Sequence, residues 1–123
     1  MATKKFTILI VEDSPLMVEK LRELVETSES VKKIISASDY KNAISLIDNE
    51  KPHVVLLDLH LPAKSGIEVL RYIRKNNDTI KVIMVTNQIT QYHKDLCFKL
   101  GAQHFIDKSK DFESIPAIIT SLS

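Results

Sequence analysis

The stretch HVVLLDLHLP, residues 53–62, decides the fold of this chain. Four apolar residues, Val54 to Leu57, lead directly into a carboxylate. Such a run is typical of a strand that is buried on both faces, as parallel strands are. Pro62 cannot continue a central strand, because proline has no N–H for the ladder. We therefore expect Asp58 to lie at the carboxyl end of a buried strand, the edge at which open α/β sheets bind ligands.

The rest of the chain alternates between strand and helix patterns. Four more strands are predicted, at residues 6–11, 34–37, 81–86 and 103–107, and helices at about 15–28, 40–49, 67–77, 89–100 and 111–121. The fourth helix is expected to turn Ile89, Tyr92, Leu96 and Leu100 inward. Because no strand pair is joined by a hairpin, the pattern predicts right-handed crossovers and a parallel sheet with helices on both faces. The fold class is α/β, a three-layer αβα sandwich with a five-stranded sheet in the flavodoxin-like order 2-1-3-4-5.

Composition excludes several classes of protein. A chain of 123 residues fits one domain, and 17 basic against 16 acidic residues give a net charge of +1. This balance gives no electrostatic reason to expect direct nucleic acid binding or a membrane surface as the main partner. The apolar run near the amino terminus is too short for a signal peptide or a membrane-inserted segment. The single cysteine, Cys97, suits a reducing cytoplasm, so the predicted location is cytoplasmic. Two glycines are too few for a glycine-rich phosphate loop.

Polar side chains follow four of the predicted strands. They are Glu12 and Asp13 after the first, Asp58 after the third, Thr86 after the fourth and Lys108 after the fifth. Because parallel strands end at one edge, we expect all five to meet there. In the order 2-1-3-4-5, Lys108 starts two strands from Asp58, ~10 Å away along the sheet. Only a long side chain such as lysine can cover that distance.

The charges at this edge predict a metal ion. Three carboxylates and one ammonium carry an excess of negative charge, which would raise at least one carboxyl pKa if no cation were bound. All the candidate ligands are oxygens, which favours Mg²⁺ over zinc. Mg²⁺ with few protein ligands is typical of phosphoryl transfer, in which Asp58 can act as a nucleophile.

This constellation resembles the receiver domain of two-component response regulators, whose members include single-domain chemotaxis regulators. The resemblance covers the whole chain, so residues 1–123 are predicted to form a single receiver domain. It is carried by Glu12, Asp13, Asp58, Pro62, Gly66, Thr86 and Lys108.

The resemblance implies a phosphorelay function. Asp58 would accept a phosphoryl group from a histidine kinase or a histidine phosphotransfer protein. Mg²⁺ would be held by Asp13 and Asp58 directly, by Glu12 through water and by the backbone carbonyl of His60. Lys108 would pair with the phosphoryl oxygens. Thr86 and Phe105 would form a switch that reshapes the surface of helix 4, strand 5 and helix 5, and so signals to an output domain or target protein.

Three positions depart from the family pattern. Ser109 stands where the family often has a proline in a cis bond, and a cis bond before any other residue costs ~3 kcal/mol. Phe105 replaces a frequent tyrosine, and the acidic pair is Glu-Asp instead of Asp-Asp. Gln88, two residues after Thr86, occupies a position that influences the phosphoryl lifetime in the family.

Other functions are also considered. The chain could be the N-terminal receiver fragment of a longer DNA-binding or enzymatic response regulator. It could, more remotely, be a phosphohydrolase with an aspartate nucleophile, but that chemistry needs a second carboxylate two residues later as general acid, and His60 stands there instead. In the favoured interpretation it is no enzyme beyond its own phosphorylation and dephosphorylation. Leu16 is expected to be exposed beside the site, either as an ordinary surface leucine or as part of a kinase docking patch.

Overall fold

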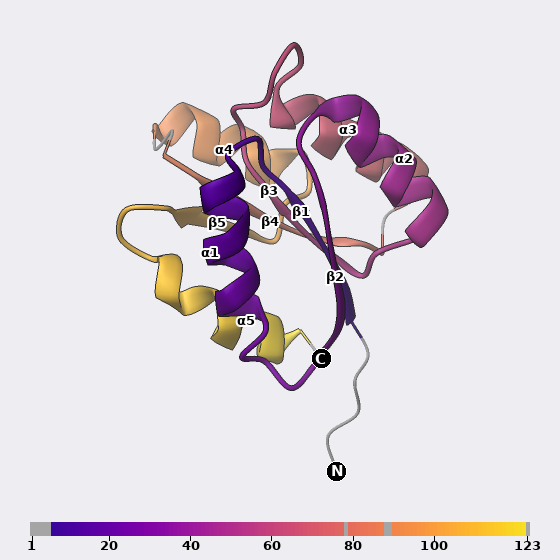
Figure 1. The fold of residues 1–123 in the computed structure, drawn as a ribbon. Helices are drawn as coiled ribbons and strands as arrows, with labels where there is room; N and C mark the ends of the chain where they lie inside the picture. The colour runs from indigo at the N-terminus through magenta and orange to yellow at the C-terminus, as the bar shows by residue number, and fades with distance from the viewer. Residues whose placement is uncertain (1–5, 78, 88–89, 123) are drawn as a thin grey trace.

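The computed structural model describes residues 6–77, 79–87 and 90–122. Strands and helices alternate along this chain, as the pattern of apolar runs predicts (Figure 1). The strands are β1 (Phe6–Val11), β2 (Val31–Ala37), β3 (Val54–Leu57), β4 (Lys81–Thr86) and β5 (His104–Asp107). The helices are α1 (Pro15–Val25), α2 (Tyr40–Glu50), α3 (Gly66–Asn76), α4 (Gln91–Lys99), a short 3₁₀ turn η1 (Phe112–Ser114) and α5 (Ile115–Ser121).

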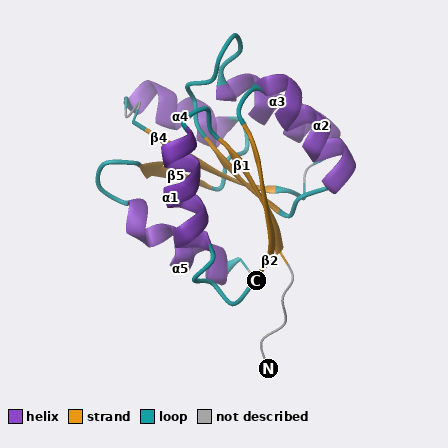
Figure 2. Ribbon diagram, in the orientation of Figure 1, coloured by secondary structure: helices purple, strands orange, loops and turns teal. Residues whose placement is uncertain are grey.

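The five strands form one parallel sheet in the order β2-β1-β3-β4-β5. The sheet is the middle layer between two layers of helices (Figure 2). Both the α/β class and the strand order predicted from the sequence are confirmed. Strand β3 lies in the centre, and all four of its residues are buried, because neighbouring strands and both helical layers cover it. The register pairs Val11 with Leu57, so the ends of β1 and β3 lie side by side.

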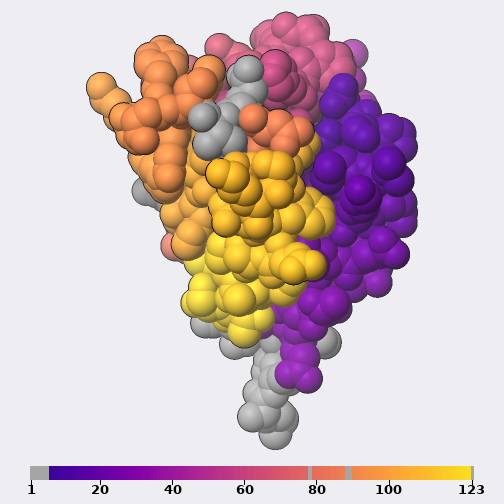
Figure 3. Space-filling view, turned by 90° about the vertical axis from the view of Figure 1, so that its left-hand side faces the viewer, coloured from indigo at the N-terminus to yellow at the C-terminus, as the bar shows by residue number. Residues whose placement is uncertain are grey.

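Each face of the sheet has its own apolar core. On one face, α1 and α5 bury side chains such as Leu21, Val25, Ile115 and Ile119 against β1, β3 and β4. On the other, α2, α3 and α4 bury Ala43, Leu70 and Cys97. Figure 3 shows α5 in yellow beside α1 in indigo. Residues near the two ends of the chain are thus packed together, and Ser28 Oγ lies 3.0 Å from Thr120 Oγ1.

Side-chain caps fix where the helices begin. The side chains of Ser14, Asp39, Ser65 and Thr90 each accept a hydrogen bond from a backbone N–H in the first turn of α1, α2, α3 and α4. Proline at the first position of α1 lacks an N–H that would have no partner within the helix. Because β1 and β3 run parallel, the loops β1–α1 and β3–α3 follow the carboxyl ends of their strands at one rim of the sheet.

Some predicted details were wrong. Strand β2 begins at Val31, three residues before the predicted start, and α3 begins at Gly66, which was expected to lie in a loop. Helix α4 does not turn Tyr92 inward, since that side chain is 71% exposed, whereas Cys97 is fully buried. Ile89 lies outside the described residues. The exposure of Leu16, at 69%, is confirmed.

Candidate functional site

The β1–α1 loop supplies two carboxylates at the rim. Glu12 and Asp13 follow β1 directly, and Ser14 caps α1 by accepting a hydrogen bond from Met17 N–H. Glu12 is 3% exposed, and its Oε2 accepts a hydrogen bond from Ser14 N–H at 3.1 Å. Asp13 is exposed at the mouth of the site. The two neighbouring acids therefore differ, one being fixed in the protein and the other open to solvent.

Asp58 is the first residue after β3 and is 6% exposed. Its backbone N–H continues the sheet pairing by donating to the carbonyl of Val11 at 3.1 Å. Its side-chain Oδ1 accepts a hydrogen bond from His60 N–H, two residues further along the chain, at 3.3 Å. The backbone and one carboxylate oxygen are held in this way, and the second oxygen faces the lysine described next.

Lys108 reaches across two strands to both buried carboxylates. Its Nζ lies 2.5 Å from Glu12 Oε1 and 3.0 Å from Asp58 Oδ2, and its side chain is 8% exposed. The backbone N–H of Lys108 donates to the carbonyl of Thr86 at 3.0 Å, which anchors the base of the side chain to the end of β4. The sequence argument that only a long cationic side chain could cover this distance agrees with the observed contact.

Burial disfavours the charged forms of Glu12 and Lys108, whereas their hydrogen bonds and ion pairs favour the charged forms. Burial raises the pKa of Glu12, because removal from water disfavours the charged carboxylate, and the hydrogen bonds from Lys108 and Ser14 offset only part of the effect. Burial by itself would lower the pKa of Lys108, but the hydrogen bonds to Glu12 and Asp58 outweigh it and the pKa is raised. Lys108 is therefore held as a cation between two acids.

The acids are close enough to share one metal ion. Glu12, Asp13 and Asp58 each place one carboxylate oxygen within 4.8 Å of the other two. Lys108 compensates only part of their negative charge. Oxygen donors around an excess of negative charge suit a hard divalent cation, and the exposure of Asp13 leaves room for water ligands, as Mg²⁺ prefers. The residues present thus fit the expected Mg²⁺.

The remaining predicted residues surround this cluster. Thr86 is fully buried at the end of β4, and Phe105 is half-buried in β5, paired in register with Met84. His60 exposes its ring, so its backbone and not its imidazole is turned to Asp58. The bond between Lys108 and Ser109 is trans, as are all the described peptide bonds. Gln88 lies outside the described residues.

Gly66 was used in the sequence prediction only as part of the family pattern and was placed in a loop, and its close approach to Asp58 was missed. Its N–H donates to the carbonyl of Leu59 at 2.8 Å, and a Cβ built on Gly66 would stand 2.0 Å from the carbonyl oxygen of Asp58. Only a residue without a side chain lets α3 begin so close to the β3–α3 loop. The sequence signal was present, since Gly66 is one of two glycines in the chain.

Comparison with known proteins identifies the family. The family model of the response regulator receiver domain matches residues 8–120. The chain therefore belongs to the receiver domain family of two-component response regulators, as the five side chains at the rim had suggested. No helix in the described ranges has both the length and the apolar character needed to span a membrane.

Individual relatives share the fold at moderate identity. The chain is 32% identical over 108 residues to the probable C4-dicarboxylate response regulator DctR of Bacillus subtilis, covering 88% of this chain and 48% of DctR. It is 31% identical over 117 residues to the protein PilH of Pseudomonas aeruginosa, covering 94% of this chain and 95% of PilH. A LuxR-family two-component response regulator from Aurantimonas sp. has a similar structure, with a TM-score of 0.89 and 27% identity, over 97% of this chain and 85% of that one. The chain spans about half the length of the first curated relatives it matches.

Proposed function

We propose that this receiver domain accepts a phosphoryl group on Asp58. The observation that carries the proposal is the contact of Lys108 Nζ with Asp58 Oδ2 at 3.0 Å in a buried cluster of acids. A lysine there can follow the phosphoryl oxygens once the carboxylate is modified, because they carry more negative charge than the carboxylate itself. The donor would be a phosphohistidine of a histidine kinase or a histidine phosphotransfer protein.

The transfer conserves atoms and charge without an outside oxidant or base. One Asp58 carboxylate oxygen donates an electron pair to phosphorus, the P–O bond forms, and the P–N bond of the phosphohistidine breaks. The leaving imidazole nitrogen keeps the electron pair of the broken bond and takes up a proton from water. Hydrolysis later returns the phosphoryl group to water as inorganic phosphate. The protein's chemistry would be limited to these two reactions on itself.

Mg²⁺ would be held by Asp13 and Asp58, by the carbonyl of His60, and by Glu12 through water. When bound, it supplies positive charge that stabilises the transferring phosphoryl group. Because Lys108 already engages Glu12, Asp13 is the carboxylate at the mouth that remains for the metal. Lys108 orients the carboxylate oxygen Oδ2, and the fixed backbone after β3 keeps Asp58 in place.

The output surface would be formed by α4, β5 and α5. Thr86 would turn its hydroxyl to the phosphoryl group, and Phe105, half-buried beside Met84, would move inward as space opens. Without a phenolic hydroxyl, Phe105 would act through packing only. The recipient would be an output domain or a target protein, and the proposed location is cytoplasmic.

A second candidate is a receiver that works as one part of a longer regulator. The chain matches nearly the whole of PilH but only half of DctR, so relatives of both architectures are found. The phosphorylation chemistry proposed for Asp58 is the same in both cases.

Incubation with acetyl phosphate and Mg²⁺, followed by intact-mass measurement, tests the proposal. We expect one added phosphoryl group, none in Asp58→Asn, and none after chelation of the metal. Asp39→Asn is the matched control, since asparagine caps α2 as aspartate does and the loss of charge is equal. It should be modified like the unaltered protein. Addition that persists in Asp58→Asn would refute the proposal, and rapid turnover of varied phosphate monoesters would favour a phosphohydrolase.

A further inference from the structure

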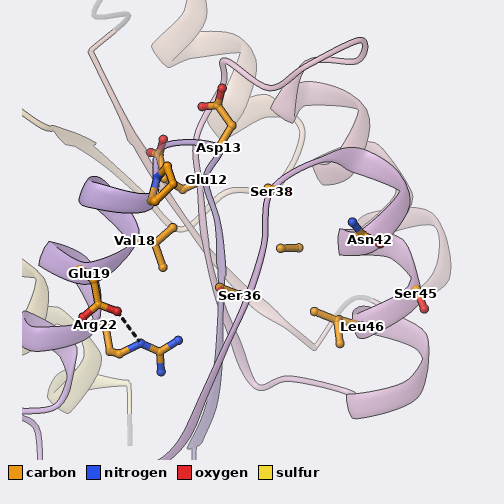
Figure 4. A pocket seen from close by; sticks show the side chains of 12 residues that line it. Glu12, Asp13, Val18, Glu19, Arg22, Ser36, Ser38, Asn42, Ser45 and Leu46 are labelled. Carbon is orange, nitrogen blue, oxygen red and sulfur yellow. Dashed lines mark ion pairs between the residues drawn. The ribbon is translucent and has the colours of Figure 1, made fainter.

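A groove of about 650 Å³ lies along the edge of the sheet, between α1 and α2. Figure 4 shows strand β2 running through it, with Val18, Glu19 and Arg22 of α1 on one side and Asn42, Ser45 and Leu46 of α2 on the other. Glu12 and Asp13 form its upper end. The groove therefore begins at the proposed phosphorylation site and follows the outermost strand away from it.

The floor of the groove is an edge strand. Strand β2 is the last in the sheet order and pairs with β1 alone. Glu12 N–H donates to the carbonyl of Ala37, which fixes that carbonyl on the β1 side, whereas Arg22 Nη1 donates to the carbonyl of Ile34 at 3.4 Å from the groove side. Because backbone groups alternate along a strand, Ile34 and Ser36 direct their N–H and carbonyl groups outward. Arg22 occupies the Ile34 carbonyl, so the Ile34 N–H and both groups of Ser36 remain for an added strand to pair with.

Steric limits select what can pair there. The edge of β2 lies between two helices, so a second copy of this chain, whose own edge is equally recessed, would bring helix against helix before the strands could meet. A single extended segment has no such flanking helices. Five residues of it, matching Ile34 to Ser38, would span ~16 Å. Asn42 and Ser45 on the α2 wall carry polar side chains that can bond to a polar segment.

Charge selects the segment further. Glu19 lies 3.7 Å from Arg22, and Glu12 is paired with Lys108, so these charges are compensated within the protein. Asp13, exposed at the upper end, forms no ion pair with any residue in the described ranges. The groove thus presents one uncompensated carboxylate, which complements a cationic side chain near one end of the segment.

We propose that this groove binds an extended segment of another protein as an additional strand on β2, with a lysine or arginine of that segment at Asp13. One consequence rests on the proposed function: because Asp13 is also a proposed metal ligand, the segment and Mg²⁺ compete. A bound segment then slows phosphorylation of Asp58. The groove is a regulatory docking site that binds an extended peptide segment with a basic residue next to the proposed phosphorylation site.

Capped pentapeptides made of strand-forming residues test the pairing. TVTVK would bring its lysine to Asp13 if the peptide binds parallel to β2, and KVTVT would do so if it binds antiparallel. In the control peptides TVTVE and EVTVT, a glutamate replaces the lysine. Titration into ¹⁵N-labelled protein should give saturable shifts of the Ile34 and Ser36 amide signals with one lysine peptide. The matching glutamate peptide should bind about tenfold more weakly, since it meets Asp13 with a like charge. The N-methylated lysine peptide, which has no backbone donors, should bind about tenfold more weakly as well.

Variants of β2 separate strand pairing from general attraction. Ser36→Pro removes a groove-facing N–H and should weaken binding about tenfold, whereas Ser36→Ala keeps that N–H and should bind like the unaltered protein. If Ser36→Pro does not fold, the N-methylated peptide still decides the question. Equal binding of the N-methylated or glutamate peptides, or no saturable shift at millimolar peptide, would overturn the proposal.

Competition with Mg²⁺ distinguishes this inference from the proposed function. Saturating Mg²⁺ should weaken the lysine peptide about tenfold and the peptide should slow acetyl phosphate labelling of Asp58. Peptide binding that Mg²⁺ leaves unchanged would refute the competition at Asp13. If no peptide binds but Asp58 is still labelled, the groove proposal fails while the phosphorylation proposal stands.

Discussion

Gly66 lies so close to the backbone of Asp58 that a single methyl group at this position should displace the proposed phosphorylation site. A Cβ at Gly66 would stand 2.0 Å from the carbonyl oxygen and 2.9 Å from the carbonyl carbon of Asp58. An ordinary contact needs at least 3.4 Å, so Gly66→Ala requires the two backbones to separate by about 1.4 Å. The nearest atoms belong to backbone, which cannot move aside as a flexible side chain can.

The displacement should affect phosphorylation more than stability. Moving a reacting group by ~1 Å can cost about 100-fold in rate, so we expect Gly66→Ala to lower the rate of labelling by acetyl phosphate and Mg²⁺ by about that factor. Overpacking should lower the free energy of unfolding by only about 1–3 kcal/mol. The two quantities are measured by the time course of mass addition and by urea unfolding.

The other glycine is the matched control. Gly101, in the loop after α4, has φ +105°, and a Cβ there would meet the flexible side chain of Arg74 at 2.5 Å. Gly101→Ala should therefore cost ~1–3 kcal/mol of stability through backbone strain but leave the labelling rate within about twofold, because it does not touch the loop after β3. A Gly66→Ala protein that is labelled as fast as Gly101→Ala would refute the reasoning about the Asp58 backbone.

Three further outcomes follow from buried or paired groups. Lys108→Met leaves Glu12 and Asp58 buried without their cation, so the free energy of unfolding in urea without metal should fall by about 3–5 kcal/mol and recover in part with Mg²⁺; unchanged stability would contradict the role of Lys108. Burial raises the pKa of the Cys97 thiol to about 11, so the folded protein keeps a proton that the unfolded chain loses at lower pH. The free energy of unfolding is then unaffected below pH about 9 and should fall by about 3 kcal/mol as the pH rises to about 11, a loss that Cys97→Ala should not show. The hydrogen bond to the Asp48 carboxylate raises the pKa of Tyr72, and Asp48→Asn should move the ultraviolet titration of this phenol to lower pH; an unmoved titration would show that Asp48 does not control it.

The fold was predictable wherever apolar runs had one interpretation. Strands β1 and β4 begin and end where the sequence predicts, because each is a run of apolar residues with clear boundaries. Strand β2 was predicted too short, since Lys32 and Lys33 interrupt the apolar pattern on an exposed edge. The inward face of helix α4 was predicted wrongly. It carries large apolar residues on opposite flanks, and only packing against the sheet decides that Cys97 is buried while Tyr92 and Phe98 are not.

The candidate site was predictable because parallel strands end together. Asp58 and Lys108 are separated by 50 residues in sequence, and the strand order alone places them at one rim. Which carboxylates the lysine would choose was not predictable. The choice depends on Glu12 being buried and Asp13 being exposed. These two neighbours have different environments because the chain turns here to enter α1, which is capped by Ser14.

This difference between two adjacent acids would let one rim serve both the proposed metal site and the proposed docking groove. Lys108 satisfies Glu12, which is buried and would otherwise carry an uncompensated charge. Asp13 is left to recruit a cation from solution, and the structure offers it two directions: inward to Asp58, where the oxygens suit Mg²⁺, and along β2, where a peptide cation would lie. Both cations need the same carboxylate, so occupancy of one site lowers the affinity of the other by the same factor. A receiver in which a lysine of the protein itself paired with Asp13 would lose that coupling. The proposed regulation through the groove therefore depends on Asp13 having no ion-pair partner among the described residues.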